Sequence, residues 1–323
     1  MGFIDNFKYN YQKKIFLSAL NDNDEYEVER LIKIYIESKN PFYYSLLAEN
    51  IESIQNILEK SNNVKPNIIW LNGFDETTGN ILEQFLDFYF SNSSTKIKYK
   101  FNSYIDEVVE KLSIFKESHN LTFTDFVLNS DFYQLLISYA NKEQIIFLKN
   151  NMAFFEHDSG KKFTYKNFTN SYFYILQNPK NIYLKLKNDQ KAIDDNGQSI
   201  FNLDQRPLQQ SIIYHGQKHF IEVNRSSWKN NVSSWDNENV KNTHRGLILK
   251  LEDLVEDPIY NFAVVLSHIS QSNVDIEIDY NLIQKYVADN ALRDLSPIGE
   301  LSNKELKIFD RELSEKAKEH GYT

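Results

Sequence analysis

The stretch NPFYYSLLAENIESIQNILEKSN, residues 40–62, contains two helical patterns joined by a short turn. Pro41 stands at the first helical position, where its missing N–H group costs no hydrogen bond. The second pattern has apolar side chains at steps of three and four, which predicts one apolar helix face: Ile51, Ile54, Ile57 and Leu58. The turn over 48–50 is so short that the two helices must run antiparallel. The stretch therefore predicts a helical hairpin.

This hairpin resembles the ankyrin repeat, in which a Thr-Pro-Leu opening, a turn and a second apolar helix follow in that order. Pro41 takes the proline position, Ser45 the small-residue position and Asn50 the position of the turn histidine. Glu49 and Ser61 stand where the family has glycines, which is a departure from its pattern. The resemblance implies hairpins that stack on one another, because a single repeat cannot bury its apolar face.

Four further windows repeat the hairpin pattern more loosely: 16–38, 132–151, 171–189 and 207–224. The segment AIDDNGQS (192–199) resembles the hairpin tip of an ankyrin repeat. Residues 64–130 match least, although 76–90 and 104–115 both predict helices. Residues 280–320 predict two charged amphipathic helices, which would cover the open end of a stacked core.

The resemblance implies an all-α fold, a degenerate ankyrin-like α-solenoid of helical hairpins with short β-hairpin or loop tips and a C-terminal helical cap. We expect N-terminal ankyrin-like repeats over 1–152, divergent repeats with irregular loops over 153–279, and capping helices over 280–323. The composition agrees, because the chain has only 9 glycines and 6 prolines for tight turns.

Composition also limits the partners of the chain. The net charge of −9 disfavours nucleic acid, which needs a basic surface, and favours a basic protein partner. The chain has no cysteine, so it has no thiolate ligands and no cysteine nucleophile. No stretch approaches the roughly 18 consecutive apolar residues of a membrane span. We therefore expect a cytoplasmic protein without a membrane partner.

Two histidines suggest a metal site that the sequence does not complete. His215 and His219 have the spacing that places two ligands on one helix face. Gly216 interrupts that helix, however, and no carboxylate motif adds a further ligand. We therefore expect no metal and no cofactor.

An enzyme in residues 150–250 remains an alternative interpretation. The triplet Tyr214-His215-Gly216 is similar to the opening motif of some ADP-ribosyltransferases, with Ser226-Ser227-Trp228 and Glu277 as further matches. Such an enzyme, ADP-ribosyltransferase-like or a nuclease, would use the repeats as a targeting arm. The matches are short, and motifs of this length arise by chance.

The resemblance implies a protein–protein interaction module without catalytic residues. Our first interpretation is an immunity or antitoxin protein that occludes a toxin, and a secreted effector that binds a host protein is the alternative. The binding positions implied for a hairpin tip are Asp195, Asn196 and Gln198, and those near helix ends are Ser138, Tyr139 and Tyr214. Trp228 and Trp235 lie in a polar stretch and are either interface anchors or anchors that hold a long loop against the fold.

Overall fold

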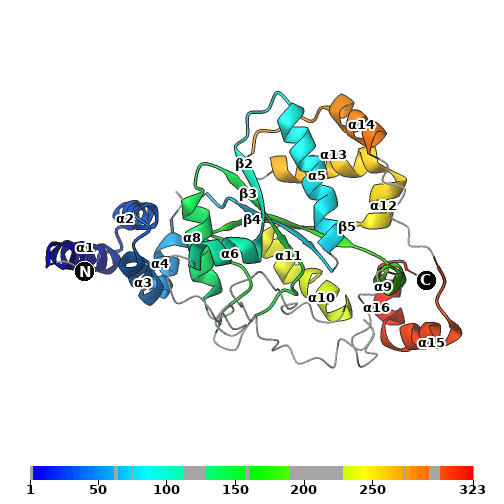
Figure 1. Cartoon of the computed structure of the whole chain (residues 1–323), viewed down its shortest axis with the longest axis horizontal. Helices are drawn as coiled ribbons and strands as arrows, with labels where there is room; N and C mark the ends of the chain where they lie inside the picture. The colour runs from blue at the N-terminus through cyan, green and yellow to red at the C-terminus, as the bar shows by residue number, and fades with distance from the viewer. Residues whose placement is uncertain are drawn as a thin grey trace.

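The computed structural model of the chain describes residues 3–61, 65–74, 76–112, 129–156, 160–188, 228–271, 274–290 and 299–322. Its centre is a five-stranded sheet with the order β2-β3-β1-β4-β5, in which every neighbouring pair is parallel. Figure 1 shows the sheet with helices packed around it. The strands are β1 (Ile68–Gly73), β2 (Tyr99–Ser103), β3 (Ile145–Asn150), β4 (Thr169–Leu176) and β5 (Gly246–Lys250).

The parallel sheet shows that the predicted all-α solenoid and the ankyrin resemblance are both wrong. Residues 145–150, predicted as a second helix, form β3, and residues 169–176, predicted to begin another hairpin, form β4. Strands of a parallel sheet are buried on both faces, so they read as continuous apolar runs without alternation. Such short runs cannot be distinguished from helix segments by periodicity. For the same reason the sequence did not predict β1, whose six residues are all buried.

Four helices cover one face of the sheet: α5 (Glu76–Asn92), α12 (Leu251–Glu256), α13 (Pro258–Ser270) and α14 (Tyr280–Asp289). They share a buried cluster with Ile69 of β1 and Phe173 of β4. At its centre the ring of Phe85 stacks on that of Phe262, with centroids 3.9 Å apart. This cluster packs α5 along the sheet, from the turn after β1 to the ring of Tyr99 at the start of β2.

The opposite face is covered by α6 (Tyr104–Leu112), α8 (Ser130–Ala140), α10 (Trp228–Trp235) and α11 (Glu238–His244). Trp70 of β1 points into this layer and is fully buried. Its ring lies 4.8 Å from those of Tyr104 and Phe163, and its Nε1 donates to Thr169 Oγ1 at 2.9 Å. The chain therefore has a layered α/β architecture with an aromatic core on each side of the sheet.

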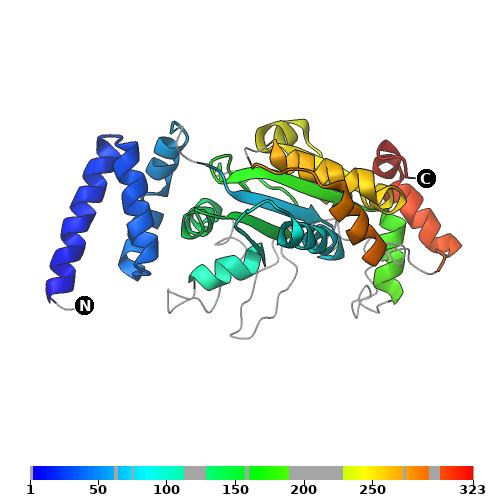
Figure 2. The ribbon, with the colours of Figure 1, turned by 90° about the horizontal axis from the view of Figure 1, so that it is seen from above.

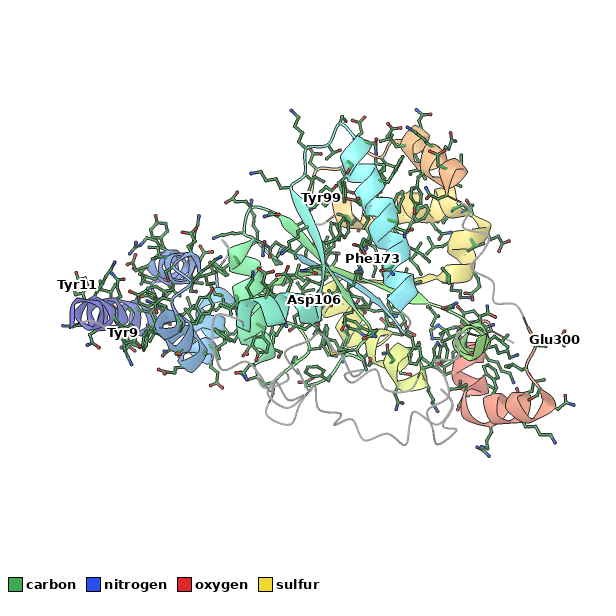
Figure 3. The ribbon with its side chains drawn as sticks, in the orientation of Figure 1. Tyr9, Tyr11, Tyr99, Asp106, Phe173 and Glu300 are labelled. Atoms are coloured by element: carbon green, nitrogen blue, oxygen red, sulfur yellow. The ribbon has the colours of Figure 1, made fainter. Side chains whose placement is uncertain are left out.

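The N-terminal helices project from this body as an arm: α1 (Phe3–Asn21), α2 (Glu25–Glu37), α3 (Pro41–Glu49) and α4 (Ile51–Leu58). The hairpin predicted over 40–62 is confirmed as a local structure, and the Asn40 side chain caps it by accepting from the N–H of Phe42 at 3.0 Å. Figure 2 shows the arm beside the sheet, and Figure 3 places Tyr11 at its far end. The arm meets α8, where Tyr139 donates to Glu29 at 3.3 Å.

The C-terminal helices do not cap a solenoid. Three helices lie together at the opposite end of the molecule from the arm: α9 (Pro179–Asn188), α15 (Asn303–Glu312) and α16 (Ser314–Glu319). Phe309, Leu313 and Ala317 are buried there. Strands from both sides of the expected boundary at residue 152 join the same sheet.

Burial of one histidine makes the stability of this fold sensitive to acid. His244 ends α11 and lies 5.9 Å from the ring of Phe154, and burial together with the positive charge of Lys162 lowers its pKa to about 4. The unfolded imidazole takes up a proton near pH 6.5, whereas the folded one does so only near pH 4. Protonation between these values therefore favours the unfolded chain.

We expect the His244→Leu variant to lose less stability than the native chain when the pH falls from 7 to 4.5. The native loss from this group amounts to roughly 3 kcal/mol at most across its window, at about 1.4 kcal/mol per pKa unit. Urea unfolding at both pH values measures the difference. The pKa values of His268 and His320 are also lowered by burial, but both remain in the variant. Parallel pH profiles for the two proteins would contradict the assignment.

Candidate functional site

The strand order singles out the carboxyl end of β1. From β1 the chain crosses one face through α5 and reaches β2 on the far side of β3. From β3 it crosses the opposite face, where Phe163 joins the core, and reaches β4 on the other side of β1. In open parallel sheets, ligands bind outside the carboxyl ends of the strands where successive connections diverge in this way. This places the expected ligand site at the turn from β1 into α5.

This turn leads from a buried strand directly into a long helix. β1 ends at Gly73, Phe74 is buried beneath the turn, and the 17-residue α5 begins at Glu76. The first N–H groups of such a helix have no partner within the helix and carry its positive dipole end. The turn therefore offers hydrogen-bond donors at the edge of the sheet.

Lys149, at the carboxyl end of β3, holds the start of α5 in place. Its ammonium group lies 2.5 Å from Glu83 Oε2 and donates to Asn80 Oδ1 at 3.1 Å. A Cβ placed on Gly79 would lie 3.5 Å from both the Lys149 stem and the Leu71 carbonyl oxygen, which shows how closely the helix approaches the strands. Lys149 thus adds a positioned cation beside the turn.

At this edge, each of two buried side-chain amides has one atom without a hydrogen-bond partner among the described residues. Asn72 is fully buried, and its Oδ1 accepts from Asn150 Nδ2 at 3.1 Å, but its Nδ2 has no partner among the described residues. Gln177 follows β4 directly, is 5% exposed, and its Oε1 likewise has none there. A buried polar group without a partner costs about 1–3 kcal/mol. Groups of this kind call for an explanation such as a bound ligand or water.

The C-terminus closes one side of the same edge. The Glu252 carboxylate accepts from the N–H of Asn178 at 3.0 Å and from the Tyr322 hydroxyl at 2.8 Å. Burial, followed by the charge of Glu252, raises the pKa of the Tyr322 hydroxyl, which therefore stays protonated and donates. The ammonium group of Lys250 lies 5.5 Å from the centre of the Tyr322 ring. The last residues are thus fastened over the ends of β4 and β5.

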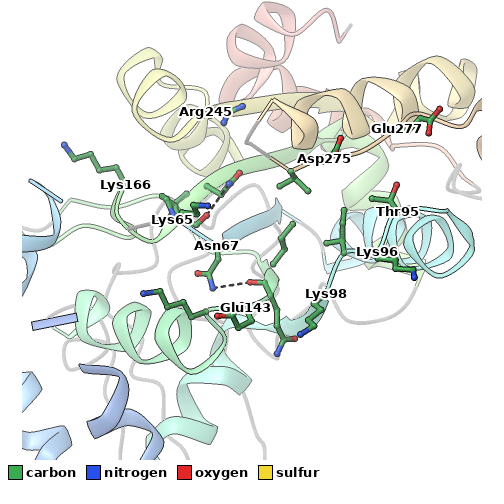
Figure 4. A pocket seen from close by; sticks show the side chains of 18 of the residues that line it. Lys65, Asn67, Thr95, Lys96, Lys98, Glu143, Lys166, Arg245, Asp275 and Glu277 are labelled. Carbon is green, nitrogen blue, oxygen red and sulfur yellow. Dashed lines mark hydrogen bonds between the residues drawn. The ribbon is translucent and has the colours of Figure 1, made fainter. Parts of the chain in front are cut away.

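A large cavity lies at the opposite, amino edge of the sheet. Its volume is about 1070 Å³, and its lining carries six basic and three acidic side chains. Figure 4 shows Lys65 and Lys166 on one side of it and Asp275 and Glu277 on the other. Asn67 lines its floor but is saturated, because its Nδ2 donates to three backbone carbonyl oxygens and its Oδ1 accepts from Ser138.

The residues predicted to bind a partner near helix ends are buried. Ser138 is 6% exposed and bonds to Asn67, and Tyr139 is 5% exposed and faces Glu29 of the arm. The remaining predicted positions, Asp195, Asn196, Gln198 and Tyr214, lie outside the described residues, as do His215 and His219.

Trp228 and Trp235 lie in the helix α10 rather than in a polar loop, and both are buried. Trp228 Nε1 donates to the carbonyl oxygen of Gln177 at 3.1 Å, and Trp235 Nε1 donates to that of Met152 at 2.9 Å. Their contacts therefore join α10 to the sheet. Glu277, the glutamate of the ADP-ribosyltransferase comparison, is exposed at the amino-edge cavity.

The immunity-protein interpretation is wrong together with the solenoid on which it rested. It followed from a repeat fold combined with an acidic composition, and the observed fold is a layered parallel sheet. Sequence reasoning also missed Asn72, Lys149 and Gln177, because none of their strands was recognised. The available signal was an apolar run, IIWLN, followed by Gly73 and a helical pattern from residue 76.

Fold and edge geometry together define a parallel α/β protein with a ligand site expected at the carboxyl ends of its strands. No protein-family model matches the chain, and no curated protein sequence matches it. Among solved structures, it is similar to a mouse sulfotransferase complexed with PAP, at 13% identity and a TM-score of 0.45. That likeness covers 78% of this chain and 84% of the sulfotransferase. It is too distant to assign a function.

Two features are absent from the described residues. Within the ranges given above, no helix is long and apolar enough to cross a membrane. Within those ranges there is also no group of three or more His, Cys, Asp or Glu side chains that could hold a metal ion.

Proposed function

We propose that this chain is an enzyme that binds a phosphate-bearing ligand of nucleotide size at the carboxyl edge of its sheet and acts on that ligand there. The observation that carries the proposal is the buried Nδ2 of Asn72, which has no partner among the described residues and lies at the carboxyl end of the central strand, just before the turn that leads into α5. Both features offer donors, and donors at a helix N-terminus suit the oxygens of a phosphate group.

Other features of the edge support the same ligand class. Lys149 supplies a cation whose position is fixed by Glu83 and Asn80. Gln177 offers an acceptor on the β4 side, which suits a hydroxyl or amino group on the remainder of the ligand. Tyr322 and Glu252 bound the edge beyond β4. Donors in the middle and an acceptor at the side match a molecule with an anionic part and a polar part.

A pair of asparagine variants tests this proposal. We expect Asn72→Leu to weaken nucleotide binding at least about 10-fold, since one hydrogen bond to a charged group contributes about 1.5–3 kcal/mol. The free energy of unfolding of this variant should change by less than about 1 kcal/mol. The substitution removes an amide that already has one atom without a partner, and Asn150 Nδ2 keeps its bond to the carbonyl oxygen of Met152. Asn50→Leu, in the helical arm, is the matched control and should bind as the native chain does.

The measurement is calorimetric titration with adenosine, AMP, ADP, ATP and adenosine bisphosphate, beside a thermal melt of each variant. Each titration is run with and without magnesium ions, because Asp75 and Glu76 follow Gly73 in the sequence and carboxylates bind magnesium together with phosphates. Equal affinities for the native chain and Asn72→Leu, or no binding at millimolar concentrations, would contradict the proposal.

A further inference from the structure

A basic residue stands just before every strand of the sheet. Lys65 precedes β1, Lys98 precedes β2, Lys142 precedes β3, Lys166 precedes β4 and Arg245 precedes β5. Because all five strands are parallel, the residues before them meet at one edge, and all five line the amino-edge cavity. The parallel topology thus brings five basic residues that are distant in the sequence together on one surface.

Most of this charge is not neutralised. Lys142 lies 2.8 Å from Glu29, whereas Lys65, Lys98, Lys166 and Arg245 have no ion pair among the described residues. A concentration of like charge is unfavourable by itself, and it is unexpected in a chain with a net charge of −9. Lysines and arginines gathered around a concave surface raise the local concentration of an anion.

Three of these cations form the part of the cavity that is best suited to an anion. Lys65 and Lys166 each stand three residues before the paired residues Ile68 and Thr169, at the starts of the neighbouring strands β1 and β4. Arg245 precedes β5 and is level with Ser171, further along β4. Figure 4 shows Asp275 and Glu277 on the other side, towards Lys96. An anion with several charged groups would therefore reach Lys65 and Lys166 at the starts of two strands and Arg245 beside the third.

The lining also restricts what kind of anion fits. None of the described lining residues is aromatic, whereas proteins that bind single-stranded nucleic acids stack bases on aromatic rings. A volume of about 1070 Å³ is close to the upper limit of about 1,000 Å³ for small-molecule sites. Both observations favour a compact molecule over a polymer.

We propose that this amino-edge cavity binds a compact anion that carries several phosphate or sulfate groups, held by Lys65, Lys166 and Arg245. The site is separate from the carboxyl edge and does not depend on the function proposed there. Guanidinium and ammonium groups bind phosphate and sulfate oxygens through charge-assisted hydrogen bonds. Arg245 starts from a left-handed backbone conformation (φ 51°) at the end of α11, which fixes the point from which its side chain extends.

The experiment is calorimetric titration of the full chain with tripolyphosphate, inositol hexakisphosphate and sucrose octasulfate. The test protein carries Lys65→Gln, Lys166→Gln and Arg245→Asn, since asparagine tolerates the left-handed conformation. The control protein carries Lys8→Gln, Lys14→Gln and Lys318→Gln, which remove the same charge from exposed positions elsewhere. Comparing the two proteins separates a specific site from the effect of net charge.

We expect the test protein to bind at least about 30-fold more weakly than the native chain, and the control less than about 3-fold. Tighter binding of the phosphate compounds than of the octasulfate, or the reverse, then identifies the group that is preferred. Asn50→Leu, in the helical arm, should bind all three compounds as the native chain does. Equal losses in the test and control proteins would overturn the proposal, and so would binding of a single-stranded oligonucleotide or a polyglutamate peptide but of none of the three compounds.

Discussion

Trp235→Ala should cost about 3–5 kcal/mol of unfolding free energy, as expected for a large aromatic side chain removed from a packed core. The indole is fully buried and lies 5.5, 5.1 and 4.9 Å from the rings of Phe154, Phe163 and Tyr172. Truncation would leave a cavity between these rings. It would also remove the shorter of the two hydrogen bonds to the carbonyl oxygen of Met152, leaving the one from Asn150 Nδ2.

Chemical denaturation of the variant beside the native chain measures this loss. Tyr26→Ala is the matched control, because Tyr26 is 75% exposed and a surface change of this kind costs at most about 0.5 kcal/mol. The result also separates the two interpretations of the tryptophan in the sequence. An unaltered melt would contradict the structural role and favour an exposed interface anchor.

Asn67→Leu should destabilise the chain by about 2–4 kcal/mol, although it exchanges side chains of similar size. Its Nδ2 donates to the carbonyl oxygens of Ser138, Asn141 and Gln144, and its Oδ1 accepts from Ser138 Oγ at 2.7 Å. One side chain thus ties the end of α8 to β1. Removing it leaves buried groups unsatisfied, and each such group costs about 1–3 kcal/mol.

Comparison with Asn72→Leu tests whether the loss of stability in Asn67→Leu comes from its hydrogen bonds. Both asparagines are buried in or next to β1, but only Asn67 has all its hydrogen-bonding groups engaged. Thermal and urea unfolding should therefore show a large loss for Asn67→Leu and a small one for Asn72→Leu. Similar losses for the two variants would mean that the difference in hydrogen bonding does not decide their stability.

The sequence predicted most of the helices but not the fold. The helices at 41–49, 51–58 and 76–92 could be predicted because each carries its apolar residues at helical spacing, the first of them with Pro41 at its first position. The strands were missed because IIFL at 145–148 and YFYIL at 172–176 show no alternation. The cluster of β-branched and aromatic residues in these short runs was the signal that favoured strands.

The sequence indicated even less of the candidate sites than of the fold. Asn72 and Gln177 are single amides in ordinary surroundings, and their significance depends on burial and on the absence of a partner. Lys65 and Arg245 are 180 residues apart in the sequence, with Lys166 between them, and the three line one cavity only because their strands are parallel neighbours. No spacing rule within one segment can reveal a group that is assembled by strand order.

The place of β1 in the sheet affects how the chain folds during its synthesis. Both neighbours of this central strand come later, beginning at Ile145 and Thr169. Translation adds about 5–20 residues per second, so the apolar segment IIWLNG leaves the ribosome several seconds before either partner exists. The helices α1 to α4, which precede it, depend mainly on contacts among neighbours in the sequence and can form during that interval. The nascent chain therefore carries a folded arm followed by an unpaired apolar strand, which is the kind of segment that chaperones recognise.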